Sequence, residues 1–263
     1  MFNGLVREIA VVQGFAGNVL SLKARHKPSL GDSIAVNGAC LSVVKVFAGG
    51  FAVELSKETR TRIAAQNLKD RVHIEPAMRL QERVDGHLMQ GHIDGVGEIS
   101  RIVQNENGTD FFVKIPPNLQ KFMASKGSVG VDGVSLTINE VLNGGIRLTI
   151  IPLTMRESLF GSYRVGRKVN IESDLLARYV VNALENGVLL EVASSFSKGV
   201  NLEENSGFSK GKNSSAVQNA AFKNSRQNGD LRAFVSGENP QNSQKNSQGK
   251  PSWQDIERIS YLY

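Results

Sequence analysis

The chain contains an internal repeat, and this repeat constrains its fold more than any other feature. Residues 33–43 read SIAVNGACLSV and residues 128–138 read SVGVDGVSLTI, a match at an offset of 95 positions. The same offset relates Thr59 to Thr154. Similarity at a fixed offset is typical of a structural unit that has been duplicated. The sequence therefore predicts two tandem copies of one domain.

Two further matches define the extent of the copies. Residues 72–75 match residues 169–172 at an offset of 97, and residues 2–9 match residues 92–99 at an offset of 90. Small insertions in loops account for this drift. We expect an N-terminal domain over residues 1–90 and a C-terminal domain over residues 91–173, joined near residues 86–91.

Each copy has the pattern of an all-β domain. Short runs of β-branched and apolar residues flank Asn-Gly or Asp-Gly turns, and further Gly-Gly turns follow. Many short strands at even spacing favour a small closed barrel. The predicted strands are 33–36, 41–46 and 51–55 in copy one, and 129–131, 136–141 and 146–151 in copy two. One or two helical turns are expected over residues 61–68 and 155–160.

The sequence after the second copy changes character twice. Apolar residues recur at helical spacing after Asp174, which predicts a helix over 174–190 that Asp174 caps. Residues 197–251 are rich in Asn, Ser, Gln, Gly and Lys, a low-complexity composition that predicts a disordered extension. Residues 252–263 regain amphipathic spacing and are expected to form a short docking helix.

Charge and cysteine content exclude several classes of protein. The net charge is +6, but residues 198–250 hold eight basic and four acidic side chains, so that segment supplies +4. The remainder is nearly balanced, and no nucleic-acid-binding face is expected. One cysteine and four histidines argue against a structural zinc site. With no membrane-spanning run and no signal peptide, we expect a cytoplasmic protein.

Six short strings appear in order within this duplicated frame, and together they resemble the riboflavin synthase family. The resemblance extends from Met1 to about Asn186. The strings are MFNGLV (1–6), VNGACLSV (36–43), SKET (56–59), GHLMQGHID (86–94), VDGVSLT (131–137) and VNIESDLLARY (169–179).

The resemblance implies a fold and a reaction. The fold is two Greek-key six-stranded β-barrels followed by a trimerisation helix. The reaction moves a four-carbon unit between two molecules of 6,7-dimethyl-8-ribityllumazine, giving riboflavin and a pyrimidinedione, without metal or added cofactor. Each site would form between the N-terminal barrel of one subunit and the C-terminal barrel of the next. A non-catalytic lumazine- or flavin-binding protein of the same fold is the alternative, and association with lumazine synthase stays open.

Site residues follow from the resemblance, position by position. The first pocket would be formed by Phe2, Gly4, Leu5, Val6, Cys40, Leu41, Ser42, Glu54, Leu55, Ser56, Lys57, Glu58 and Thr59. The second would be formed by Gly91, His92, Ile93, Ser135, Leu136, Thr137, Ile151, Pro152, Leu153, Thr154, Met155 and Arg156, with Lys126 contributed by a neighbouring subunit. The expected catalytic residues are Cys40, His92, Asp132 and Ser135.

Several of these residues have two interpretations. Cys40 suits either a small core position or a role at the acceptor ring. Asp132 next to glycine suits either turn chemistry or proton transfer, and His92 suits a base, a stacking partner or a backbone contact. Asp174 either caps the helix or also binds a ribityl hydroxyl. The chain departs from the family pattern at Asn3, Ser42 and Leu153, and the last removes a potential ligand contact.

Overall fold

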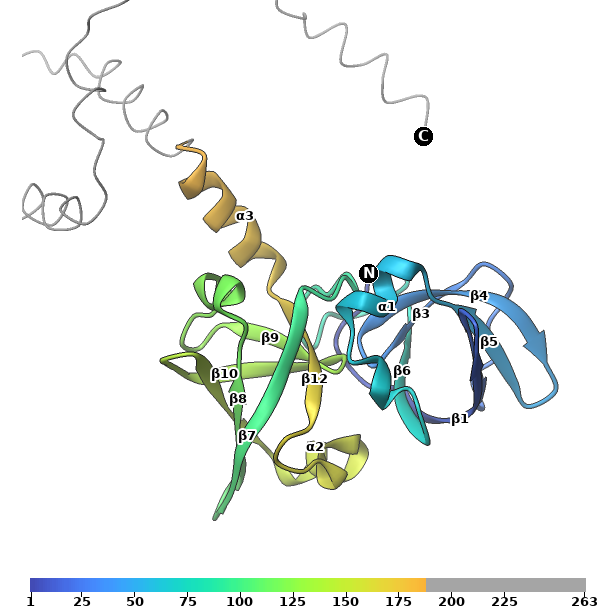
Figure 1. The fold of residues 1–263 in the computed structure, drawn as a ribbon, viewed down its shortest axis with the longest axis horizontal. Coiled ribbons are helices and arrows are strands. Elements are labelled where there is room, and N and C mark those ends of the chain that lie inside the picture. The colour runs from blue at the N-terminus through green and yellow to red at the C-terminus, as the bar shows by residue number, and fades with distance from the viewer. Residues whose placement is uncertain (188–263) are drawn as a thin grey trace, which may run out of the picture. The chain divides into compact units, whose positions relative to one another are not determined.

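The computed structural model describes residues 1–187, and most of them form two closed antiparallel β-barrels (Figure 1). Barrel 1 contains β1 (Glu8–Ala16), β2 (Val19–Lys23), β3 (Ser33–Val36), β4 (Ala39–Phe47), β5 (Gly50–Glu54) and β6 (Arg71–Pro76). Barrel 2 contains β7 (Gly95–Asn105), β8 (Gly108–Lys114), β9 (Ser128–Val131), β10 (Val134–Leu142), β11 (Gly145–Ile150) and β12 (Lys168–Ser173).

The two barrels share one topology. Barrel 1 closes in the order β1-β2-β5-β4-β3-β6, and barrel 2 closes in the corresponding order β7-β8-β11-β10-β9-β12. In each barrel, two connections cross to a strand that is not the neighbour, which is the Greek-key arrangement. The prediction of two six-stranded barrels is therefore confirmed. The expected low-complexity extension (197–251) and docking helix (252–263) lie outside the described residues.

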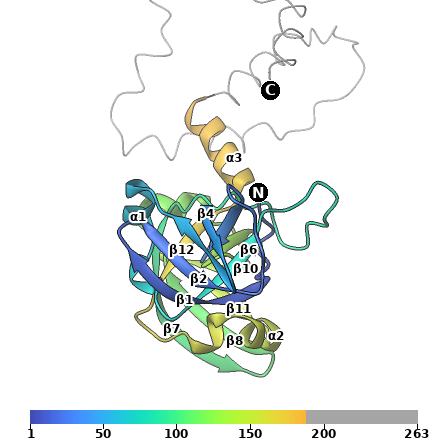
Figure 2. The same cartoon turned by 90° about the vertical axis from the view of Figure 1, so that its right-hand side faces the viewer.

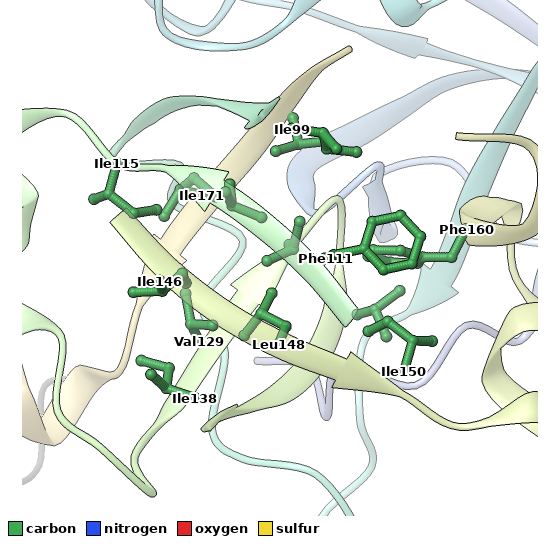
Figure 3. Close-up of a cluster of buried hydrophobic side chains, with 14 of the residues drawn as sticks. Ile99, Phe111, Ile115, Val129, Ile138, Ile146, Leu148, Ile150, Phe160 and Ile171 are labelled. Atoms are coloured by element: carbon green, nitrogen blue, oxygen red, sulfur yellow. The ribbon is translucent and has the colours of Figure 1, made fainter. Parts of the chain in front are cut away.

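Each barrel encloses its own apolar core. Alternation positions the core residues: in β8, every second side chain is buried. Figure 3 shows the core of barrel 2, where strand residues such as Ile99, Phe111 and Leu148 surround the interior together with Phe160. Barrel 1 buries an equivalent set that includes Leu20, Phe51 and Val53. Each core is thus filled with side chains, and a ligand must bind at a barrel's edge rather than inside it.

Short helices follow the fifth strand of each barrel. They are α1 (Lys57–Arg62) and the 3-10 turn η1 (Ala65–Asn67) in barrel 1, and α2 (Pro152–Glu157) and η3 (Leu159–Ser162) in barrel 2. Barrel 2 has one more 3-10 turn, η2 (Pro117–Phe122). The first helices begin three or four residues before the predicted ones. Ser56 explains this in α1, because its Oγ accepts the Thr59 N–H at 3.0 Å and caps the helix.

A longer helix, α3 (Leu175–Glu185), follows β12 and leads away from barrel 2 (Figures 1 and 2). Asp174 caps it, since its Oδ1 accepts the Leu176 N–H at 2.8 Å. A helix after the second barrel and its Asp174 cap are confirmed, although the helix ends at Glu185 and residues 188–190 lie outside the described part of the chain. Four large apolar side chains on α3 are 55–70% exposed: Leu176, Tyr179, Val180 and Leu184. No helix within residues 1–187 is long and apolar enough to cross a membrane.

Hydrogen bonds at the start of each barrel correct one part of the repeat alignment. Glu75 accepts the N–H groups of Asn3 and Gly4, at 2.7 and 3.1 Å. The matching Glu172 accepts those of Gln90 and Gly91, at 2.6 and 3.0 Å. Gly4 is therefore equivalent to Gly91, both with a positive φ.

The true offset over this segment is consequently 87 positions, and the offset of 90 that paired Phe2 with His92 is wrong. Phe2 instead corresponds to Met89. These two residues pair with each other, since each N–H donates to the other's carbonyl, at 2.8 and 3.0 Å. The Glu172 carboxylate accepts the N–H groups of both Gln90 and Gly91, so these two residues belong to one structural segment. The expected domain boundary between residues 90 and 91 therefore stays a prediction.

The barrels meet at two tight turns. In one barrel the turn is Asn37–Gly38, and in the other it is Asp132–Gly133. A Cβ on Gly38 would lie 2.7 Å from the Gly133 nitrogen, and the converse distance is also 2.7 Å. Only glycine allows two backbones to approach this closely. The Asn-Gly and Asp-Gly pairs therefore serve both as turns and as the contact between barrels.

His73 and Asn170, at matching positions in β6 and β12, connect the two barrels. His73 donates from Nδ1 to the Asp132 carbonyl at 2.8 Å, and its Nε2 accepts the Leu159 N–H at 2.7 Å. Nε2 can accept only when it carries no proton. Burial lowers the pKa of His73 to about 4, so the ring is neutral at pH 7.

Asn170 forms the equivalent two bonds from barrel 2 to barrel 1. Its Nδ2 donates to the Asn37 carbonyl at 2.8 Å, and its Oδ1 accepts the Ala64 N–H at 2.7 Å. The neutral imidazole of His73 thus offers one donor and one acceptor where Asn170 offers an amide. Together the two residues join each barrel to the turn and the short helix of the other.

We predict that His73→Asn preserves the junction and makes stability less dependent on acidity. A histidine whose pKa falls on folding stabilises the native state above pH 6.5, and this contribution is lost as the pH falls towards 4. The pKa difference corresponds to about 3 kcal/mol. Urea unfolding should therefore show wild type losing about that much more than His73→Asn between pH 6.5 and pH 4. Parallel pH profiles for the two proteins would contradict this role.

Candidate active site

The segments that precede the barrels are exchanged between them. The Cys40 N–H in barrel 1 donates to the Gly91 carbonyl at 2.9 Å, and the Ser135 N–H in barrel 2 donates to the Gly4 carbonyl at 2.8 Å. Residues 4–6 therefore lie along barrel 2, and residues 91–93 lie along barrel 1. This pairing is the reverse of the sequence expectation. The barrels contact each other at the junction, so each leading segment passes along the other barrel before the first strand of its own barrel begins.

A hollow of about 360 Å³ lies at the edge of barrel 1, within the size range of small-molecule sites. It brings together Cys40 from β4, Thr59 from α1 and His92 from the exchanged segment. The complete lining is Ala39, Cys40, Glu58, Thr59, Arg62, Ile63, Gly91, His92, Ile93 and Asp94. Six of these ten were expected as site residues, while Ala39, Arg62, Ile63 and Asp94 were not.

The equivalent edge of barrel 2 carries a hydrogen-bonded pair that the sequence did not reveal. The His87 Nδ1 lies 2.7 Å from the Ser135 Oγ. His87 is 9% exposed, and its Nε2 is buried without a hydrogen-bond partner in the described part of the chain. Burial lowers the pKa of His87, although Asp174 opposes the shift, so the ring is neutral near pH 7. A neutral imidazole bonded to a hydroxyl can relay a proton.

The polar groups of the two edges differ at matching positions. Cys40 and Ser135 share one position in β4 and β10, which places a thiol in one barrel and a hydroxyl in the other. Thr59 and Thr154 share another, in α1 and α2. The two edges therefore share one threonine position and differ in one polar group, a thiol in barrel 1 and a hydroxyl in barrel 2.

Asp132 lies away from the hollow, at the barrel junction. Its carboxylate has no exposed surface and accepts the Tyr163 hydroxyl at 2.6 Å and the Asn170 N–H at 2.7 Å. Burial raises its pKa to about 6, against the effects of these two donors and of Arg167. This geometry gives Asp132 a part in the junction, and its role in proton transfer stays a prediction.

The other expected site residues divide into three groups. Phe2, Leu41 and Leu55 are buried in the cores, and Leu136 packs against the core of barrel 2. Glu54 ends β5, Ser56 caps α1 and Lys57 begins it. At the matching place in barrel 2, Ile151 is the N-cap residue of α2, and Pro152, Leu153, Met155 and Arg156 lie within α2. The remaining residues are exposed on strands or loops or cap a helix: Ser42, Thr137, Lys126 and Asp174.

Lys126 lies in the loop before β9, where its N–H donates to the Ile138 carbonyl at 2.7 Å. Contribution of Lys126 to a neighbouring subunit's site stays a prediction. Over residues 1–187, no three His, Cys, Asp or Glu side chains gather as a metal site would require.

Comparison with known proteins shows the same duplication. The model of the lumazine binding domain matches this chain twice, over residues 3–77 and 90–174. Riboflavin synthase of Bacillus subtilis (strain 168) is 37% identical over 196 residues, which cover 70% of this chain and 90% of that protein. Riboflavin synthase of Photobacterium leiognathi is 42% identical over 154 residues, covering 58% and 71%.

Solved structures of LumP have a similar fold. The complex with 6,7-dimethyl-8-(1'-D-ribityl)lumazine aligns with a TM-score of 0.60 at 20% identity, covering 66% of this chain and 99% of LumP. The complex with riboflavin aligns with a TM-score of 0.61 at 21% identity.

We predict that Gly91→Ala disturbs the edge of barrel 1 more than backbone strain alone explains. A Cβ on Gly91 would lie 2.6 Å from the Cys40 Cβ. Gly17 is the matched control, because it also has a positive φ but has nothing within 4 Å of a new Cβ. Gly17→Ala should cost about 1–2 kcal/mol of unfolding free energy, and Gly91→Ala about 1–3 kcal/mol more. Equal losses in urea unfolding would refute the contact.

Proposed function

The chain belongs to the riboflavin synthase family of duplicated lumazine-binding barrels, and on that premise we propose how its two edges act together. The reaction combines two molecules of 6,7-dimethyl-8-ribityllumazine into riboflavin and 5-amino-6-(D-ribitylamino)uracil, so the protein acts as a transferase. The observation that carries this proposal is the pair of matching edges, each completed by the other copy's leading segment.

A reaction between two identical molecules needs two similar pockets. Binding both molecules removes much of the entropic barrier to their encounter. One molecule must give four carbons and the other must accept them, so the pockets must also differ. The thiol of Cys40 with His92 nearby, against the Ser135–His87 pair, supplies such a difference. Protein side chains then need to support only ring binding and proton transfer.

The catalytic unit that we propose is a homotrimer. Each site forms between barrel 1 of one subunit and barrel 2 of the next, so that the two lumazines meet. The exposed apolar side chains of α3 support this assembly, because burying them against other copies would remove them from water. A cytoplasmic location and an association with lumazine synthase stay predictions.

A lumazine- or flavin-binding protein without activity is the second candidate, and the likeness to the LumP complexes favours it. Retention of polar groups in both copies supports the enzyme instead. Cys40 and Thr59 lie at one edge, and Ser135, His87 and Thr154 belong to the other. A protein that only stores a chromophore needs one such pocket.

The decisive experiment is incubation of the pure protein with 6,7-dimethyl-8-ribityllumazine. We expect riboflavin absorbance to grow with one pyrimidinedione released per riboflavin, as chromatography would show. Cys40→Ala and Ser135→Ala should each lower kcat, because each disables one member of the pair. Tight lumazine binding without any riboflavin formation would contradict the proposed enzyme and support the binding-protein alternative.

We predict that Leu176→Asp breaks the assembly and stops turnover. An aspartate on the apolar face of α3 would bury a charge at the contact between copies. Leu80→Asp, in the connector between the barrels, is the control, because Leu80 is fully exposed. Sedimentation should show a trimer for wild type and Leu80→Asp, and a smaller species without activity for Leu176→Asp. A monomeric but fully active Leu176→Asp protein would contradict the proposed assembly.

A further inference from the structure

Arg178 differs from the residues around it on α3. Its neighbours Tyr179 and Val180 are more than half exposed, whereas the Arg178 side chain is only 23% exposed. The guanidinium lies between two carboxylates. Nη1 is 3.5 Å from an Asp94 oxygen, and Nη2 is 3.6 Å from a Glu172 oxygen. Arg178 is therefore an internal contact of α3 and lies apart from the helix's exposed apolar face.

The two carboxylates hold opposite ends of one short segment. Glu172 accepts the N–H groups of Gln90 and Gly91, as described above, and is 1% exposed. Asp94 accepts both the N–H and the hydroxyl of Ser173, each at 2.7 Å. Residues 90–94 are thus fixed at both ends. This is the segment that supplies Gly91, His92 and Ile93 to the barrel 1 hollow.

We propose that Arg178 is a positioning residue that ties α3 to the wall of the barrel 1 pocket by pairing with Glu172 and Asp94. The proposal rests on the function proposed above. Three contacts connect Arg178 to the pocket wall. Arg178 pairs with Glu172, Glu172 holds the Gly91 N–H, and the Gly91 carbonyl accepts the Cys40 N–H at 2.9 Å. A helix that we assign to assembly therefore also sets the geometry of one pocket.

Among residues 1–187, no ion pair links α3 to the segment that lies along the edge of barrel 2. Glu75 holds Asn3 and Gly4 in the same way, but the cation acting on it is Arg7, which follows on the same segment. The segment along the edge of barrel 2 is therefore stabilised within residues 3–7 and β6. Loss of Arg178 should affect the pocket that contains Cys40 and His92 and spare the one that contains Ser135.

Electrostatics supplies a readout that a purely structural role would not give. Burial raises the pKa of Glu172 to about 7, opposed by the N–H groups of Gln90 and Gly91 and by Arg178, while Asp94 adds to the rise. Without Arg178, the pKa of Glu172 must rise further. The carboxylate would then be protonated near neutral pH and would hold the two N–H groups less strongly.

The test compares Arg178→Gln with Arg147→Gln. Arg147 on β11 also bridges two carboxylates, with Nη1 3.4 Å from Asp110 and Nε 3.1 Å from Glu140, and its side chain is 28% exposed. It does not line the hollow. In the full-length protein, Arg178→Gln should move the acid limb of the kcat/KM profile up by roughly one pH unit, which is about a fivefold loss at pH 7 and approaches tenfold at lower pH. Arg147→Gln should leave the profile unchanged.

Three further measurements complete the experiment. Arg178→Lys keeps the charge and, as the milder change, covers the case in which Arg178→Gln fails to fold; it should restore part of the profile. Glu172→Gln should lower kcat/KM, and the double variant Glu172→Gln/Arg178→Gln should be no worse than Glu172→Gln, since the two residues act as one unit. Sedimentation should give the same assembly for Arg178→Gln and wild type, which separates pocket geometry from oligomer loss.

The outcomes separate this inference from the proposed function. If wild type forms riboflavin and Arg178→Gln matches Arg147→Gln at every pH, the inference is overturned and the enzyme stands. If wild type forms no riboflavin, the proposed function fails. Fluorescence titration with 6,7-dimethyl-8-ribityllumazine then tests the wall directly, with a larger loss of binding from pH 9 to pH 7 expected for Arg178→Gln than for wild type. An equal loss in the two proteins would overturn the inference there too.

Discussion

The structure depends on a reciprocal set of hydrogen bonds between two copies of one barrel. In each copy, a turn residue and a side chain in the last strand meet the corresponding pair of the other copy. Asn37 and Asp132 hold the N–H groups of His73 and Asn170, whose side chains in turn hold the opposite turns. All of these groups are buried, so an unmade bond would carry the full desolvation cost. The junction is therefore specific as well as close.

The geometry of both edges depends on this junction. The side chains of His73 and Asn170 also reach Leu159 and Ala64, next to the short helices that follow the fifth strands. The turns at the junction lead directly into β4 and β10, which carry Cys40 and Ser135. A displacement between the barrels would thus move the thiol, the hydroxyl and both helices together. The two edges therefore move together as a single mechanical unit.

Sequence patterns predicted most of the fold but only part of the site. The strands around residues 33–36 and 128–131 have clear turn signals and alternation, and a constant offset relates them. The segments before β1 and β7 have neither. Their register is set by Glu75 and Glu172, about seventy to eighty residues further along the chain, and their destination by bonds to backbone carbonyls. A backbone carbonyl acceptor is present at every residue, so the sequence could not reveal the exchange between barrels. The contact between the side chains of His87 and Ser135 depends on that exchange and was missed with it.

The exchanged segments also limit how such a protein can be divided. A half-chain that ended after β6 would keep residues 4–6 but would have no second barrel to receive them, and its own Cys40 would lack the Gly91 carbonyl. Two such half-chains could repair both defects by exchanging their leading segments around a twofold axis. Fusion of the two copies then turns an encounter between molecules into an event within one chain. It also frees the copies to diverge, which a symmetric pair of identical chains cannot do.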